Sequence, residues 1–308
     1  MKDKPVNVAA SVHDRLLLRS KAEGRPFEEV LLHYAIERFL FRLSRSRHRS
    51  GFVLKGALML RFWGGPSSRS TRDIDLAGVK PASIDGILEI FRQILAVKVE
   101  DDGLRFETDS LRGEEIRVDA EYDGVRVKFT SYLEKAMIRL QADIGFGDVI
   151  TPVAREIVYP SLLGLDEPKL LGSTPETAIA EKFQAMVVLD TANSRMKDFF
   201  DLCLLANCRQ FEGRVLASAI KATFARRKTA LPGVHPSALT PLFFEAPEKQ
   251  IQWRAFLRKA RIIGPQPDLS HAVALIAIFL MPILAAAAKG ETFDLRWPPG
   301  GPWMTTQK

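Results

Sequence analysis

Two carboxylates in a short apolar run constrain the fold of this chain more than any other feature. Residues 73–77 read Asp-Ile-Asp-Leu-Ala, so acidic and apolar side chains alternate. Successive side chains of a β-strand point to opposite faces. We therefore expect Asp73 and Asp75 on one face, with Ile74 and Leu76 in the core on the other. The chain must form a sheet in which this strand has an accessible polar face.

A bound divalent cation is a common reason for holding two carboxylates so close together. Like charges at this separation repel each other, and hard carboxylate oxygens suit Mg²⁺, which takes further oxygens from water and phosphates. Centres for phosphoryl transfer often use a third carboxylate, for which Asp143 is the first choice and Asp119 the reserve. A solvated strand edge would give the same short pattern, so Asp73 and Asp75 alone do not decide the function.

A turn from strand to helix precedes the acidic pair. Residues 51–55 form a short apolar run, and Gly56 and Ala57 follow where a helical run begins. Backbone N–H groups at such a turn can bind phosphates, and a glycine lets a phosphate approach closely. The polar loop before residue 73 contributes Arg69 and Thr71 as a guanidinium and a hydroxyl for the same phosphates. These four residues are the candidate nucleotide-binding set.

The remaining pattern predicts an α+β protein. Apolar residues recur at helical spacing in residues 12–43 and 83–98. The proline-marked residues 152–175 are interpreted as a connection. Half-buried strands are predicted where apolar and polar residues alternate, at residues 104–108, 116–120, 125–129 and 140–144. Helices are predicted in the second half at residues 176–190, 196–207, 214–226 and 250–258.

The net charge of +7 favours an anionic partner. Part of the excess comes from one dense basic stretch that includes Arg42, Arg45, Arg47 and Arg49. These arginines are candidate contacts for an RNA backbone. The solvated face and frayed end of a helix is an equally good interpretation.

Residues 272–288 form an uncharged and mostly apolar run of 17 residues, broken by Pro282. A helix that spans a membrane needs about 20 apolar residues. We therefore expect a buried core helix and no association with a membrane, although an anchored protein is the alternative. The first residues are polar and are not followed by an apolar stretch, as a signal peptide would be, so the expected location is the cytoplasm.

Five separate blocks of the sequence resemble the AbiEii/AbiGii (MenT-like) toxin family, within the polymerase-β-like nucleotidyltransferase superfamily. Asn193-Ser-Arg-Met-Lys-Asp-Phe-Phe-Asp201 is the most specific of these blocks. Thr71 stands where the family usually has serine, which keeps a hydroxyl, and Ala57 where it often has glycine. The other four blocks are Lys55-Gly-Ala-Leu58, Arg69-Ser-Thr-Arg-Asp-Ile-Asp75, Asp143-Ile-Gly-Phe-Gly-Asp148 and Ala180-Glu-Lys-Phe-Gln-Ala-Met186.

The resemblance implies a fold and a domain organisation. The expected architecture is α+β, with a polymerase-β-like nucleotidyltransferase core, a mixed sheet flanked by helices, and a large helical C-terminal domain. We assign residues 1–48 to an N-terminal helical segment and residues 49–155 to the core. Residues 156–308 are assigned to the helical domain, which is expected to complete the active-site cleft.

The resemblance also implies an activity and further site residues. Asp73 and Asp75 would be catalytic, Lys182 would contact the nucleotide phosphates, and Asp198 would belong to the fourth motif of the active site. The implied reaction is Mg²⁺-dependent transfer of NMP from an NTP to an acceptor hydroxyl, expected at the 3′ end of a tRNA, which blocks translation. The implied setting is a type IV toxin–antitoxin or abortive-infection system with a winged-helix antitoxin encoded nearby.

Besides the membrane-anchored protein already considered, two interpretations compete with this one. The acceptor could be a protein or a small molecule, which the site residues alone do not distinguish from tRNA. A non-catalytic nucleic-acid-binding protein of the same fold would be expected to have lost the acidic pair or Lys182, and both are present. Asp198 and Asp201 are three residues apart on one helix face, and the sequence does not decide which of them acts in the active site.

Overall fold

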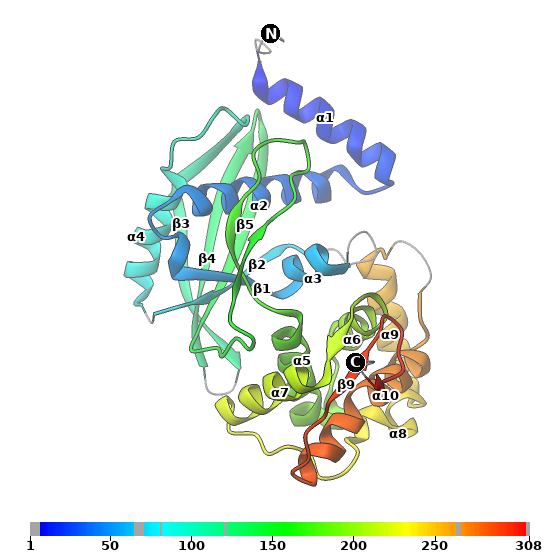
Figure 1. Ribbon diagram of the computed structural model, residues 1–308. Helices are drawn as coiled ribbons and strands as arrows, with labels where there is room; N and C mark the ends of the chain where they lie inside the picture. The colour runs from blue at the N-terminus through cyan, green and yellow to red at the C-terminus, as the bar shows by residue number, and fades with distance from the viewer. Residues whose placement is uncertain (1–6, 65–70, 81, 120–121, 263–265, 306–308) are drawn as a thin grey trace. The chain divides into compact units, whose positions relative to one another are not determined.

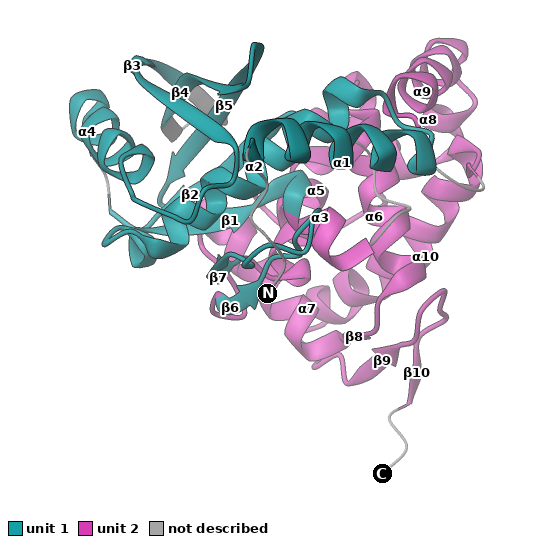
Figure 2. Cartoon of the chain, turned by 90° about the horizontal axis from the view of Figure 1, so that it is seen from above, with its two compact units in different colours: residues 1–58, 71–147, 155–172 teal, residues 59–70, 148–154, 173–308 magenta. Residues whose placement is uncertain are grey.

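The computed structural model describes residues 7–64, 71–80, 82–119, 122–262 and 266–305. The chain forms two compact units, which Figure 2 distinguishes by colour. Residues 1–58, 71–147 and 155–172 make up the first unit, and residues 59–70, 148–154 and 173–308 make up the second. The units therefore do not follow the linear boundaries expected from the sequence, because the N-terminal helices pack with the sheet.

The first unit is built on a mixed seven-stranded sheet (Figure 1). The strands are β1 (Phe52–Lys55), β2 (Asp73–Gly78), β3 (Leu104–Asp119), β4 (Tyr122–Leu133), β5 (Ala136–Phe146), β6 (Arg155–Val158) and β7 (Lys169–Gly172). Their spatial order is β3-β4-β5-β2-β1-β7-β6. The β2–β5 and β1–β7 pairs are parallel and the other neighbouring pairs are antiparallel.

Strands β6 and β7 lie within residues 152–175, which the sequence analysis interpreted as a connection. Both are only four residues long and lie at one edge of the sheet. Strand β7 pairs in parallel with β1, far away in the sequence. A four-residue strand shows too little alternation to be recognised from sequence, so its place was set by pairing with β1.

Three helices accompany the sheet: α1 (Val8–Glu23), α2 (Phe27–Arg45) and α4 (Ile84–Leu95). Gly24 ends α1 in the left-handed region, at φ +63°, where glycine has no steric penalty. An aromatic cluster joins α2, α4 and β4. The rings of Phe39 and Phe91 are 5.4 Å apart, and Phe129 lies 5.0 Å from Phe39. These buried rings fix the helices against the sheet.

Arginines of α2 are held inside the first unit by ion pairs. Arg42 donates hydrogen bonds to both carboxylate oxygens of Asp102, at 2.6 and 3.1 Å. Asp102 also accepts from the backbone N–H of Leu104, and its carbonyl accepts from the hydroxyl of Tyr34. The Arg42 side chain is only 7% exposed. The prediction that Arg42 contacts RNA is therefore wrong, because its guanidinium is buried and committed to Asp102.

The second unit is mainly helical. Its helices are α5 (Pro175–Leu189), α6 (Met196–Cys208), α7 (Gly213–Arg226), α8 (Pro241–Phe244), α9 (Pro247–Ala260) and α10 (Leu269–Ala288). A small antiparallel sheet contains β8 (Phe211–Glu212), β9 (Leu295–Trp297) and β10 (Met304–Thr305). Helix α3 (Gly56–Gly64) begins in the first unit and continues in the second. The mixed sheet with flanking helices and the helical C-terminal region confirm the expected α+β class.

Helix α10 is the one helix among the described residues that is long and apolar enough to span a membrane. It contacts α6, α7 and α8, and Ala272, Ile276 and Leu280 are completely buried. Only 44% of its most apolar window is buried, however, and Ile278 on another face is 55% exposed. The expectation of a core helix therefore holds for one face of α10.

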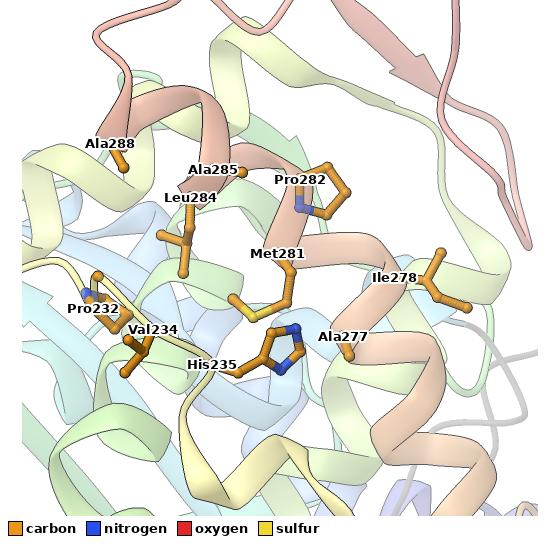
Figure 3. Close-up of a pocket in the computed structure, with 11 residues that line it drawn as sticks. Pro232, Val234, His235, Ala277, Ile278, Met281, Pro282, Leu284, Ala285 and Ala288 are labelled. Atoms are coloured by element: carbon orange, nitrogen blue, oxygen red, sulfur yellow. The ribbon is translucent and has the colours of Figure 1, made fainter.

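A cavity of about 610 Å³ lies along the less buried side of α10. Met281 and Pro282 of α10 line it together with Val234 and His235 of the segment between α7 and α8 (Figure 3). Its lining is almost entirely apolar and contains no lysine or arginine. Its described lining therefore offers a phosphate neither a guanidinium nor a lysine ammonium.

Replacing Arg42 by alanine should lower the free energy of unfolding by about 3 kcal/mol, because Asp102 would be left buried without its partner. Chemical denaturation followed by circular dichroism measures this change. Arg45→Ala is the matched control, since Arg45 lies on the same helix with an exposed side chain. Its effect should stay below about 0.5 kcal/mol. Equal effects of the two substitutions would contradict a structural role for Arg42.

Candidate active site

Strand β2 carries the acidic pair in the orientation predicted from the sequence. Asp73 is exposed and Asp75 is half-buried, whereas Ile74 and Leu76 are buried in the core. The two carboxylates therefore project from one face of the sheet.

Cross-strand pairing extends this polar face into a row of charged residues. Asp75 lies opposite Lys55 of β1 on one side and opposite Asp143 of β5 on the other. Asp143 in turn lies opposite Arg126 of β4, which lies opposite Glu114 of β3. Paired residues of neighbouring strands project from the same face. The row therefore contains two adjacent carboxylates with a cationic residue next to each.

Arg126 binds the carboxylate of Asp143 through two hydrogen bonds. Its Nε donates to Oδ1 and its Nη2 to Oδ2, both at 2.8 Å. The amide of Gln141 lies 3.3 Å from Oδ1. The hydrogen bonds to Asp143 raise the pKa of Arg126 above its ordinary value, and the charge of Asp73 adds to the effect. The sequence analysis did not single out Arg126, because one arginine in an alternating strand carries no signal of its partner.

The carboxylates of β2 have the chemistry that a hard divalent cation requires, since Mg²⁺ binds few protein oxygens and completes its shell with water and phosphates. Asp143 lies beside Asp75 in the sheet, but its carboxylate is engaged by Arg126. Within the described part of the chain, no three His, Cys, Asp or Glu side chains are grouped so that they could hold a metal ion. The candidate metal ligands on β2 are therefore Asp73 and Asp75.

Asp119, the reserve candidate, lies at the end of β3, where its backbone pairs with Tyr122. Strands β4 and β5 separate β3 from β2, so its backbone is about 14 Å from β2 at the usual strand spacing. The side chain of Asp119 lies outside the part of the chain that the structure describes, and its role as a metal ligand stays a prediction.

Gly56 makes room for the carboxylate of Asp75. Its φ is +68°, and a Cβ at this position would lie 1.9 Å from Oδ2 of Asp75. The Cβ of Asp75 would also be only 2.7 Å away, so rotation of the carboxylate could not relieve the clash. The sequence analysis expected a glycine here for the approach of a phosphate. The described contact is with Asp75, which this glycine allows to lie directly against the turn into α3.

The other predicted nucleotide-binding residues have different environments. Ala57 is buried, so its side chain faces the core. Thr71 is also largely buried, with its hydroxyl 3.4 Å from the carbonyl of Asp73. The carbonyl of Thr71 lies 3.0 Å from Nε2 of His33, a buried residue of α2. Arg69 lies outside the described residues. The contact between Thr71 and His33 holds the beginning of β2 against α2.

The second unit contains a separate buried ion cluster. The ammonium of Lys182 on α5 lies 3.0 Å from Oδ1 of Asp198 and 2.8 Å from Oδ2 of Asp201, both on α6. Nε of Arg195, at the start of α6, lies 2.7 Å from the other oxygen of Asp198. Asp198 and Asp201 are completely buried, and Lys182 is 13% exposed. Two cations and two carboxylates thus neutralise one another, with both carboxylates buried and the side chain of Arg195 41% exposed.

This cluster shows what Asp198 and Asp201, which share one helix face in the sequence, have in common. Both carboxylates are buried. They share Lys182, and Asp198 also pairs with Arg195. The two aspartates therefore have related roles, and both hold the ammonium of Lys182 in place.

The basic stretch at the end of α2 and just beyond it is only partly accessible. Arg45, Arg47 and Arg49 have exposed side chains. Arg47 donates a hydrogen bond to Gln93, and Arg49 forms an ion pair with Glu156. These three arginines are the ones that remain as candidate contacts for an RNA backbone, and the contact stays a prediction.

Comparison with protein families matches residues 38–275 to the family described as "Nucleotidyl transferase AbiEii toxin, Type IV TA system". The match covers most of the chain, including both acidic strands and the Lys182 cluster. The chain belongs to the AbiEii nucleotidyl transferase toxin family. It is therefore a transferase of a toxin–antitoxin family, and membership of that family implies an antitoxin partner.

Two crystal structures are similar to this AbiEii chain. One is of a proposed nucleotidyltransferase from H. pylori, with 16% identity and a TM-score of 0.48, covering 85% of this chain and 98% of the other. The second is JHP933 from Helicobacter pylori, with 16% identity and a TM-score of 0.47, covering 84% and 94% of the two chains. A search of curated proteins gave no match.

Replacing Gly56 by alanine should lower the free energy of unfolding by more than the same change at Gly24. Both glycines have positive φ, but a Cβ at Gly24 would meet no atom within 4 Å. Gly24→Ala therefore measures the backbone strain alone, about 1 kcal/mol. Gly56→Ala adds the clash with Asp75. Equal losses in chemical denaturation would mean that Asp75 does not depend on the space at Gly56.

Proposed function

We propose that this AbiEii protein transfers a nucleoside monophosphate from an NTP to an acceptor hydroxyl, with Mg²⁺ held by Asp73 and Asp75. The observation that carries the proposal is the pair of carboxylates on one face of β2, of which Asp75 packs directly against the turn at Gly56. Membership of a nucleotidyl transferase family supports the reaction class.

In the proposed reaction, the acceptor oxygen forms a bond to the α-phosphorus while the bond from that phosphorus to the leaving oxygen breaks. Pyrophosphate departs with the electron pair, and the hydroxyl proton leaves to solvent. Bound Mg²⁺ would neutralise charge on the phosphates during the transfer. Asp73 and Asp75 provide the carboxylates for the cation. Gly56, Ala57, Arg69 and Thr71 are proposed to contact the nucleotide through the backbone and side chains around β2.

Lys182 is proposed to bind the phosphates of the nucleotide. Its ammonium is held by Asp198 and Asp201 rather than moving at the end of a flexible chain. A lysine fixed in this way loses less side-chain entropy when an anion binds. Asp198 and Asp201 are thus proposed as positioning residues for Lys182, which assigns them one shared task.

The proposed acceptor is the 3′ end of a tRNA, and its modification would block translation in the cytoplasm. The type IV toxin–antitoxin family supports this setting, in which a winged-helix protein encoded nearby is the proposed antitoxin. Exposed Arg45, Arg47 and Arg49 are proposed contacts with the RNA backbone. Binding through phosphates of this kind should weaken as the salt concentration rises.

The direct test is incubation of the protein with tRNA, Mg²⁺ and each α-labelled NTP. Asp73→Asn should reduce label incorporation by roughly 10²–10³-fold, because a neutral amide is a poor ligand for the cation. Asp109→Asn is the matched control, since Asp109 is an exposed aspartate on the same sheet, and it should leave incorporation unchanged. Full activity of Asp73→Asn would overturn the proposal. Labelling of protein instead of RNA would mean that the acceptor is a protein and not a tRNA.

Lys182→Met should raise the KM for the NTP and also destabilise the second unit by about 3 kcal/mol, because two buried carboxylates would lose the cation that they share. Lys182→Arg keeps the charge and should retain the fold. The pair of variants separates nucleotide binding from folding when KM is measured alongside a thermal melt. Lys221→Met, at an exposed lysine of α7, is the control. An unchanged KM in folded Lys182→Met would exclude Lys182 from phosphate binding.

A further inference from the structure

Asp143 lies where a third carboxylate could bind the cation, but both of its carboxylate oxygens already accept hydrogen bonds. It lies opposite Asp75 in the parallel β2–β5 pair. Both of its oxygens accept hydrogen bonds from Arg126, and Gln141 makes a further contact with Oδ1. The side chain of Asp143 is 19% exposed and that of Arg126 is 31% exposed. The ion pair is therefore partly shielded from water and yet accessible from the polar face.

We propose that Arg126 competes with the divalent cation for Asp143 and so sets the affinity of the β2 carboxylates for metal. Arg126 is then a positioning residue of the active site, and the inference rests on the function proposed above. When Arg126 holds Asp143, the cation has Asp73 and Asp75 as its protein ligands. When Arg126 releases it, Asp143 becomes available from the neighbouring strand as a third carboxylate.

Arg126 makes two hydrogen bonds to the carboxylate of Asp143. This geometry supports direct competition between Arg126 and the cation for Asp143, rather than a general effect of positive charge. A guanidinium bound through Nε and Nη2 engages both carboxylate oxygens and fixes the plane of the carboxylate. A cation would need at least one of the same oxygens. Arg126 has no comparable alternative partner in its row, because its Nη1 is 3.9 Å from Glu114. Glu114 is paired instead with Lys128, at 2.8 Å.

Lys128 provides a matched control for the charge. It lies on β4 two residues from Arg126, so both side chains project from the same face of the strand. It carries the same charge, but its described partner is Glu114 rather than Asp143. Substitution of Lys128 therefore changes the local charge without releasing Asp143.

The test is direct binding of Mn²⁺ to the nucleotide-free protein, followed by electron paramagnetic resonance. Arg126→Gln should tighten the Kd for Mn²⁺ by about tenfold, because a charge-assisted pair no longer competes for Asp143. Arg126→Lys keeps the charge and loses the two-point contact, so it should give a smaller gain. Adding Asp143→Asn to Arg126→Gln should cancel the gain. Lys128→Gln should change the Kd much less than Arg126→Gln.

Each outcome bears on the inference. An unchanged or weaker Kd in Arg126→Gln overturns it, as does an equal gain in Lys128→Gln, which would make the effect one of charge alone. A gain that survives Asp143→Asn also overturns it. Asp73→Asn in the same assay reports on the proposed function separately. Loss of Mn²⁺ binding in Asp73→Asn with no effect of Arg126→Gln defeats the inference alone, whereas unaltered binding in Asp73→Asn defeats the metal site itself.

Discussion

Repulsion between carboxylates is the constraint on which the first unit depends. Asp73, Asp75 and Asp143 lie on two adjacent strands and on one face of the sheet. Such a group is stable only when cations lie close by. Arg126 neutralises Asp143 directly, and Lys55 occupies the neighbouring position in the row beside Asp75. The absence of a Cβ at Gly56 then allows Asp75 to approach the turn into α3.

Buried ion pairs occur in both units. A charged side chain in such a pair stabilises the fold, whereas an exposed charged side chain can contact a ligand. Arg42 and Asp102 stabilise the packing of α2, and Lys182 is enclosed by Asp198 and Asp201 between α5 and α6. Removing one partner of a buried ion pair costs much more stability than the intact pair contributes. The basic stretch around residues 42–49 therefore offers less cationic surface to an RNA than its arginines suggest, since Arg42 is committed to Asp102 inside the fold.

Predictions from sequence were correct for features that are set by a local pattern of residues. The alternation at residues 73–77 gave the strand and the faces of Asp73 and Asp75 correctly, because strand geometry fixes both. The break between α1 and α2 falls at Gly24 and Pro26, whose backbone preferences are local. Short strands β6 and β7 were missed, since they are defined by pairing with distant segments and not by their own residues.

The sequence by itself determined the acidic strand, the helical second half and the family to which the chain belongs, because these depend on local periodicity and on motifs of consecutive residues. Only the tertiary structure decided which charges neutralise one another. Arg126 and Asp143 are 17 residues apart, and Arg42 and Asp102 are 60 apart. Cross-strand register and helix packing bring such pairs together, and neither can be read from the spacing of residues along the chain.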